Sequence, residues 1–136
     1  MSHYLLFYHF IWATKNRQPW IIPELESQLF NSIRSKVSGL DGRVLAVNAC
    51  RDHVHLVASV PPSIPPSISL SNFIGQVKGT SSLRINESGL LRVIFNWQEE
   101  YGVFSLDETS LSACIFYTEK QKEHHANPLE IRKDWE

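Results

Sequence analysis

Apolar residues recur along this chain with two different periods, and the first 60 residues predict three strands and one helix. Residues 3–14 are apolar on both faces of an extended chain, as expected of a central strand. Residues 23–37 have helical spacing, begin with proline, and carry acids in the first turn and bases in the last. Residues 43–51 and 53–60 predict two strands joined by a tight turn. The helix should bury one stripe, formed by Leu25, Leu29, Ile33 and Val37.

The second half begins with PPSIPPS at residues 61–67, which predicts an extended connector because proline cannot pair inside a sheet or continue a helix. Residues 69–87 predict a second helix, although each of its two glycines costs up to about 1 kcal/mol relative to alanine. One or two strand segments follow within residues 90–105, and residues 107–125 predict a last helix. The second helix should face the core with Leu70, Phe73, Ile74, Val77 and Leu83.

This order, β-α-β-β-α-β followed by a helix, predicts an α+β fold. It is the ferredoxin-like split β-α-β pattern, an antiparallel sheet with two helices on one face and the other face left open. At 136 residues the chain is expected to form a single domain. We divide it into a sheet–helix core (residues 1–106), the last helix (107–125) and a polar tail (126–136).

Composition is that of a globular protein, with 43% apolar and 20% charged residues and no apolar run long enough to span a membrane. The two cysteines lie in apolar segments and are interpreted as reduced thiols, which favours a cytoplasmic location over a disulfide-bonded protein. A net charge of -1 argues against nucleic-acid binding. Nine of the 14 acids, however, lie from Glu99 onward, so a locally positive surface in the first 98 residues is compatible with this total.

The segment RDHVHLVASV places two histidines in an apolar strand. Because alternate side chains of a strand point to opposite faces, His53 and His55 share one face, and Val54 and Leu56 share the other. If the apolar face packs under the helices, the histidines project from the open face. They are then either solvated surface residues or ligands of a divalent metal, for which neutral imidazoles are suited.

The last helix offers a third ligand. Within ACIFYTEKQKEHH, Tyr117 and Gln121 are one helical turn apart and lie on a common stripe. One interpretation is a half-buried tyrosine above a solvated glutamine. The other makes Tyr117 a nucleophile and the amide oxygen of Gln121 a metal ligand.

Four segments together extend these observations: DHVHLV, KGTSS, WQEEYGVFS and YTEKQKEHH, in this order and spacing. They resemble the single-tyrosine HUH (histidine–hydrophobe–histidine) transposases, which include small insertion-sequence transposases and REP-associated tyrosine transposases. The resemblance extends from about residue 3 to residue 128. Thr118 departs from the family pattern, which favours an aliphatic residue after the tyrosine.

The resemblance implies an enzyme that cleaves and rejoins single-stranded, hairpin-containing DNA through a 5′-phosphotyrosine at Tyr117. It also implies that His53, His55 and Gln121 hold one divalent cation, Mg²⁺ or Mn²⁺. A homodimer is implied as well, in which the tyrosine helix is able to complete the partner's histidine pair. A connector at residues 99–108 is long enough to reach the histidines of either chain, and the resemblance favours the partner's. The expected setting is the prokaryotic cytoplasm, in association with the nucleoid.

DNA contacts are predicted from the basic and aromatic residues. Arg17, Lys78 and Arg84 are candidate phosphate contacts, and Trp97 and Tyr101 suit either base stacking or the core. One alternative function is a catalytically silent or domesticated hairpin-binding protein of the same fold. A metal-dependent nucleotide hydrolase is a second alternative; it is disfavoured because Val57 stands where a third histidine is needed and no glycine-rich phosphate loop is present.

Overall fold

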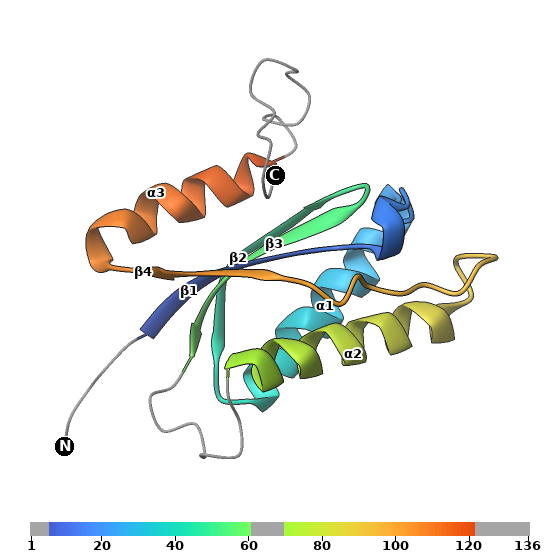
Figure 1. Ribbon diagram of the computed structural model, residues 1–136, viewed down its shortest axis with the longest axis horizontal. Coiled ribbons are helices and arrows are strands. Elements are labelled where there is room, and N and C mark those ends of the chain that lie inside the picture. The colour runs from blue at the N-terminus through green and yellow to red at the C-terminus, as the bar shows by residue number, and fades with distance from the viewer. Residues whose placement is uncertain (1–5, 61–69, 122–136) are drawn as a thin grey trace.

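The computed structural model describes residues 6–60 and 70–121 (Figure 1). Four strands, three helices and one short 3-10 helix make up this part of the chain. In chain order they are β1 (Leu6–Ala13), η1 (Lys15–Arg17), α1 (Pro23–Gly39), β2 (Arg43–Cys50), β3 (His53–Val60), α2 (Leu70–Ser88), β4 (Gly102–Leu106) and α3 (Glu108–Glu119). The predicted connector at residues 61–67, the tail and the last turns of the predicted final helix lie outside the described residues.

The four strands form one antiparallel sheet in the order β2-β3-β1-β4. β1 lies between β3 and β4, as its apolar sequence on both faces predicts. β2 and β3 pair side by side across the two-residue turn at Arg51 and Asp52. This is the topology of the split β-α-β pattern, and the predicted fold class is confirmed.

The hydrophobic core lies between the sheet and the pair α1 and α2. The predicted stripe of α1 is fully buried, and so are Phe73, Ile74 and Val77 of α2. Leu83 was expected in this core, but its side chain is 56% exposed, and Ile85 is buried in its place. Helical geometry explains the difference, because Ile85 continues the buried series of Val77 and Ser81 at four-residue spacing.

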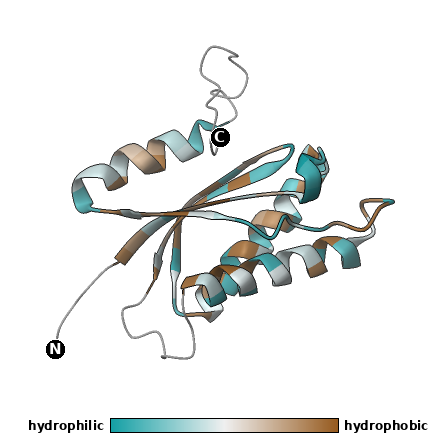
Figure 2. Cartoon of the chain, in the orientation of Figure 1, coloured by the Kyte–Doolittle hydropathy of each residue, from teal (hydrophilic) through white to brown (hydrophobic). Residues whose placement is uncertain are grey.

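The segment between α2 and β4 has no regular structure, yet polar bonds hold it to α2. The indole nitrogen of Trp97 donates to the carbonyl of Lys78 (3.0 Å) and to the hydroxyl of Ser81 (3.1 Å). Both Trp97 and Tyr101 pack against the core, so the core interpretation of these aromatics holds. Figure 2 shows that the preceding loop is partly hydrophobic, and exposed side chains there are Leu90, Val93 and Ile94.

The second face of the sheet is covered by α3, whereas the sequence pattern predicted an open face. In Figure 1, α3 lies on the opposite side of the sheet from α1 and α2, and it contacts β2 and β3. Asp107 alone separates α3 from β4. Its carboxylate accepts hydrogen bonds from the backbone N–H of Ser110 (2.8 Å) and from the hydroxyls of Thr109 (2.7 Å) and Ser110 (2.8 Å). Asp107 is therefore both the link to α3 and its N-cap.

Replacing Asp107 by alanine should loosen α3 without unfolding the core, because the cap is lost while the buried residues are untouched. Hydrogen exchange of the α3 amides should accelerate several-fold. Hydrogen bonds from Thr109 and Ser110 lower the pKa of Asp107 to about 2. The stabilisation from the ionised cap is thus fully present above the ordinary pKa of 3.8 and is lost only as the pH falls through about 2. The difference in exchange rate between Asp107→Ala and the wild type should therefore not vary with pH near 7.

The matched variant is Asp107→Asn, which keeps an acceptor oxygen and should exchange nearly as slowly as the wild type. Equal exchange rates in Asp107→Ala and the wild type would show that packing alone holds α3.

Candidate active site

His53 and His55 lie side by side on the face of the sheet that α3 covers. Their ring centroids are 5.1 Å apart, and the apolar residues that alternate with them, Val54 and Leu56, lie in the core on the other face. The predicted separation of the two faces is confirmed. The solvated-surface interpretation is wrong, because His53 is 2% exposed and His55 is 1% exposed.

Asp52, in the turn before β3, orients the first histidine. Its carboxylate Oδ1 lies 2.7 Å from Nδ1 of His53, and its Oδ2 accepts from Nε of Arg17 at 3.1 Å. The hydrogen bond from His53 is the largest cause that lowers the pKa of Asp52, and the nearby Arg17 adds to it against the effect of burial. An ionised carboxylate only accepts, so Nδ1 of His53 carries the proton and donates it. Nε2 is then the nitrogen with which this ring can coordinate a cation.

His9 of β1 is the corresponding neighbour of the second histidine. Its Nε2 lies 2.9 Å from Nδ1 of His55, and the two ring centroids are 5.1 Å apart. Burial lowers the pKa of His9 to about 4, so its imidazole is neutral near pH 7. Both histidines of the pair are therefore held through Nδ1.

Tyr117 approaches this cluster from α3 of the same chain. Its ring centroid lies 6.2 Å from that of His55, with an angle of 72° between the rings. The sequence predicted a ten-residue connector at residues 99–108 before the last helix. In the structure, residues 102–106 form β4, so Asp107 alone links that strand to α3. Within one chain, Tyr117 lies against the histidine of that same chain. The arrangement in which the tyrosine helix completes a partner's histidine pair stays a prediction.

Gln121 follows directly after the last turn of α3 and is fully buried. Within the described part of the chain, neither its amide oxygen nor its amide nitrogen has a hydrogen-bond partner. The backbone places this end of α3 above the histidines, because Nδ2 of Asn48 donates to the carbonyl of Glu119 (3.1 Å) and Asn48 is the β2 partner of His55. The solvated-glutamine interpretation is wrong.

These side chains fit a divalent cation. In residues 6–60 and 70–121, no group of three or more His, Cys, Asp or Glu could hold a metal ion. The amide oxygen of Gln121 is, however, a candidate third donor beside the two imidazoles, because an unpaired buried amide is costly and needs a partner. Two nitrogens and an amide oxygen without a thiolate suit Mg²⁺ or Mn²⁺ better than a closed zinc site.

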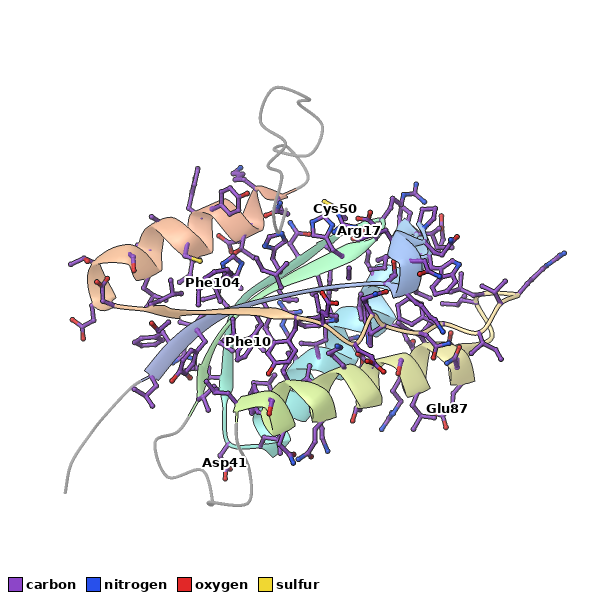
Figure 3. All side chains as sticks on the ribbon, in the orientation of Figure 1. Phe10, Arg17, Asp41, Cys50, Glu87 and Phe104 are labelled. Atoms are coloured by element: carbon purple, nitrogen blue, oxygen red, sulfur yellow. The ribbon has the colours of Figure 1, made fainter. Side chains whose placement is uncertain are left out.

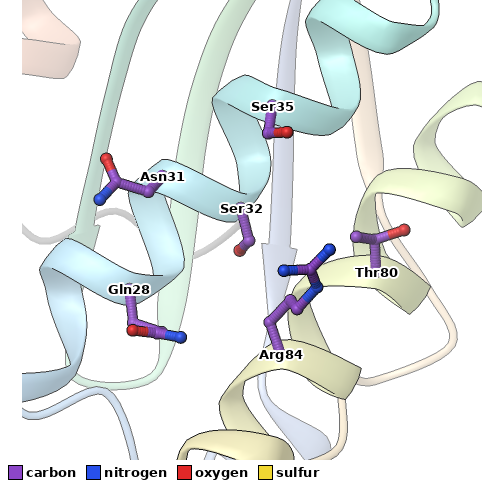
Figure 4. Close-up of a pocket in the computed structure, with 6 residues that line it drawn as sticks. All are labelled: Gln28, Asn31, Ser32, Ser35, Thr80 and Arg84. Atoms are coloured by element: carbon purple, nitrogen blue, oxygen red, sulfur yellow. The ribbon is translucent and has the colours of Figure 1, made fainter.

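The predicted basic residues divide between the two faces. Arg17 lies beside the histidines through Asp52, and Figure 3 shows it with Cys50 at one end of the sheet. Lys78 is on α2, where its ammonium donates to the carbonyls of Gln98 (2.6 Å) and Glu99 (3.1 Å). Arg84 lines a polar groove of about 310 Å³ between α1 and α2 (Figure 4). These helices lie on the opposite side of the sheet from α3, which carries Tyr117 (Figure 1). The fold brings only Arg17 of these three to the candidate site.

Sequence reasoning missed His9, Asp52 and Asn48. Asp52 directly precedes the histidine pair, so its position in the sequence was a usable signal. His9 and Asn48 offered no such signal, because their neighbours depend on strand pairing. The predicted topology pairs β1 with β3, but it does not give the register that brings His9 to His55 or sets Asn48 opposite His55.

Comparison with known proteins identifies the family of this chain. The family model described as transposase IS200-like matches residues 2–121, nearly the whole chain. The chain belongs to the IS200-like transposase family. The IS200 transposases of Salmonella typhimurium LT2 and Salmonella typhi are 32% identical to it over 80 residues, which are 59% of this chain and 50% of each relative. The chain thus spans about half the length of these two curated relatives.

A third relative and two solved structures align with a larger part of this chain than the two Salmonella transposases do. The ISDra2 transposase TnpA of Deinococcus radiodurans is 25% identical over 123 residues, covering 87% of this chain and 85% of that protein. A crystal structure of a candidate transposase from Deinococcus radiodurans R1 has a TM-score of 0.69 and 26% identity, over 88% of this chain and 93% of the other. A REP-associated tyrosine transposase bound to a REP hairpin has a TM-score of 0.65 and 13% identity, over 92% and 73%, and shows the shared fold.

Across the described part of this IS200-like chain, no helix is both long and apolar enough to cross a membrane.

Replacing Gln121 by leucine should stabilise the metal-free protein. The change removes a buried amide without partners and keeps a side chain of similar size, so the free energy of unfolding should rise by about 1–3 kcal/mol. Urea unfolding in the presence of a chelator measures it.

The control is Gln76→Leu on α2, because the amide of Gln76 is near the surface and donates to Asn72 (2.8 Å). This control should gain no stability. A loss of stability in Gln121→Leu would show that the amide is satisfied in the metal-free protein.

Proposed function

We propose that this IS200-like chain is a transposase that cleaves and rejoins single-stranded DNA at element ends through a 5′-phosphotyrosine on Tyr117. One observation carries the proposal. The ring of Tyr117 lies 6.2 Å from that of His55, which is itself beside a second buried histidine. Gln121, which follows the same helix, has a buried amide without hydrogen-bond partners. A tyrosine hydroxyl beside imidazoles that can coordinate a divalent cation suits metal-assisted phosphoryl transfer.

His53, His55 and Gln121 would hold the divalent cation, Mg²⁺ or Mn²⁺. The chemistry that a cation supplies at such a site is polarisation of the scissile phosphate and stabilisation of the charge that develops on its oxygens. Asp52 fixes the ring orientation of His53 through the bond at Nδ1. The cover of α3 excludes water from the histidines, which favours attack by the tyrosine over hydrolysis.

In the cleavage step, the hydroxyl oxygen of Tyr117 attacks the phosphorus of the scissile bond. A phosphorus–oxygen bond to the tyrosine forms, the bond to the 3′ oxygen breaks, and the proton released by the hydroxyl balances the one taken up by the new 3′-hydroxyl. Attack of another 3′-hydroxyl on the phosphotyrosine reverses these changes and rejoins strands. Because the ester conserves the bond energy, the exchange needs no ATP.

The DNA partner is proposed to be a single strand that contains a hairpin. Support comes from the family and from the shared fold of the REP-associated transposase, which was solved bound to a REP hairpin. Arg17 is 44% exposed in its side chain and lies beside the histidine site, so it is the best placed of the predicted phosphate contacts. Arg84 would serve only if the DNA also reached the groove between α1 and α2. We expect the protein to act in the prokaryotic cytoplasm, at the nucleoid.

A silent hairpin-binding protein of the same fold is the second candidate. The absence of a third His, Cys, Asp or Glu ligand among the described residues favours it, because a cation would then depend on the weaker amide ligand. The two candidates differ in whether a covalent protein–DNA product forms.

Tyr117→Phe should abolish the covalent adduct and leave hairpin binding nearly unchanged, because one hydroxyl is removed and the half-buried ring stays. The measurement incubates the protein with single-stranded element-end DNA and Mn²⁺ and resolves the products on a denaturing gel; a chelator should prevent the adduct. Tyr101→Phe is the matched control, because Tyr101 packs against the core and should keep full activity. An adduct in Tyr117→Phe would identify another nucleophile, and none in the wild type would favour the silent protein.

A homodimer is also proposed. β1 is central in the sheet, whereas β4 pairs only with β1 among the described strands. An exposed strand edge offers unpaired backbone groups to a second copy. Phe104 of β4, with 50% exposure, adds apolar surface there. Each site would be self-contained, because Tyr117 lies against the His55 of its own chain.

Mixing a His53→Ala/His55→Ala protein with a Tyr117→Phe protein should therefore restore no adduct. Each chain lacks one half of its own site, and a self-contained arrangement cannot combine the intact halves. Subunit exchange is verified with differently tagged chains, and a mixture of wild type and Tyr117→Phe is the positive control. Adduct formation in the first mixture would show that α3 serves the partner's histidines.

A further inference from the structure

His9 occupies a position that the proposed reaction does not yet explain. It projects from β1 onto the α3 side of the sheet, between the ring of His55 (2.9 Å from Nε2 to Nδ1) and the ring of Phe104 (centroids 6.3 Å apart). An apolar ring would fill this space as well as an imidazole does. Because burying an imidazole costs free energy unless it is hydrogen-bonded, the contact with His55 is the feature that distinguishes histidine here.

The 2.9 Å contact between His9 and His55 requires one proton, and its location decides what His55 can do. If Nε2 of His9 carried it, Nδ1 of His55 would accept, and the neutral ring of His55 would carry its own proton on Nε2. That nitrogen could then bind no cation. If Nδ1 of His55 carries the proton and His9 accepts it, Nε2 of His55 has a lone pair for coordination.

We propose that His9 is a positioning residue that accepts the hydrogen bond from Nδ1 of His55 and so holds this ring in the tautomer and orientation that coordinate a divalent cation. The inference rests on the cation site proposed above. It gives the histidine pair two matched supports, since Asp52 accepts from Nδ1 of His53 in the same way. Groups that orient metal-binding histidines typically change metal affinity 10- to 100-fold when they are lost.

Two substitutions separate hydrogen bonding from packing. His9→Phe keeps a ring of similar size and removes the acceptor. His9→Gln places an amide oxygen, the same number of bonds from the backbone, where Nε2 of His9 stood, and so keeps the acceptor. Phe104→Leu is the matched control, because it removes the other aromatic neighbour of His9 and leaves the hydrogen bond intact.

The first measurement is Mn²⁺ binding by calorimetry. His9→Phe should weaken binding about 10- to 100-fold, whereas His9→Gln and Phe104→Leu should stay within a few-fold of the wild type. A merely structural role predicts the opposite ranking, with the bulky ring of His9→Phe tolerated best. Wild-type affinity in a folded His9→Phe variant would overturn the proposal.

The second measurement needs neither metal nor activity. Nitrogen-15 shifts of the His55 ring, recorded in the chelated wild-type protein, report which nitrogen carries the proton. We expect a protonated Nδ1 in the wild type and in His9→Gln, and a mixture of tautomers in His9→Phe. A wild-type ring protonated at Nε2 alone would overturn the proposal, even if His9→Phe fails to fold.

The two measurements also separate this inference from the proposed function. If the wild type binds no Mn²⁺ yet His55 shows the Nδ1 proton and loses it in His9→Phe, the cation site fails while the positioning by His9 stands. If the wild type binds Mn²⁺ and His9→Phe binds it equally well, the site stands and the role of His9 fails.

Discussion

The structure depends on one constraint, that both faces of β3 are buried. One face presents Val54 and Leu56 to the core under α1 and α2, and the other presents two imidazoles to α3. Buried polar groups require hydrogen-bond partners, so the second face needs supports that the first does not. Asp52 and His9 lie at hydrogen-bond distance from the Nδ1 atoms of the pair. The bonds that burial demands at Nδ1 are thus the same bonds that would leave Nε2 available to a cation.

The placement of α3 converts this buried pair into a candidate active site. Asp107 joins the helix to β4 and caps it, so the helix direction is set within one residue of the sheet. The bond from Asn48 to the carbonyl of Glu119 holds the other end over β2. Tyr117 thus approaches His55 from a helix held at both ends, and Gln121 follows the end of that helix. In this member of the IS200-like family, the geometry places the tyrosine beside a histidine of the same chain.

The same region carries the clearest conflict between stability and function. The amide of Gln121 is buried without partners among the described residues, although leucine would pack there without that cost. Sites that bind charged ligands commonly retain such groups, because the ligand supplies the missing interaction. Lys78, a predicted DNA contact, instead stabilises the structure. Its ammonium donates to carbonyls of the loop before β4 and so helps to hold that loop in place.

The sequence by itself determined the order of the elements, the topology class and the separation of His53 and His55 from the apolar face, because side-chain periodicity follows from strand and helix geometry. It also singled out Tyr117 and Gln121 through their helical spacing. Only the tertiary structure decided that α3 covers the second face and that His9 contacts His55. It also decided that Leu83 is exposed rather than in the core, and that Arg84 lies away from the candidate site. Periodicity states which residues share a face but not which element packs on it. Contacts such as that between His9 and His55 arise from strand order and register across 46 residues of sequence.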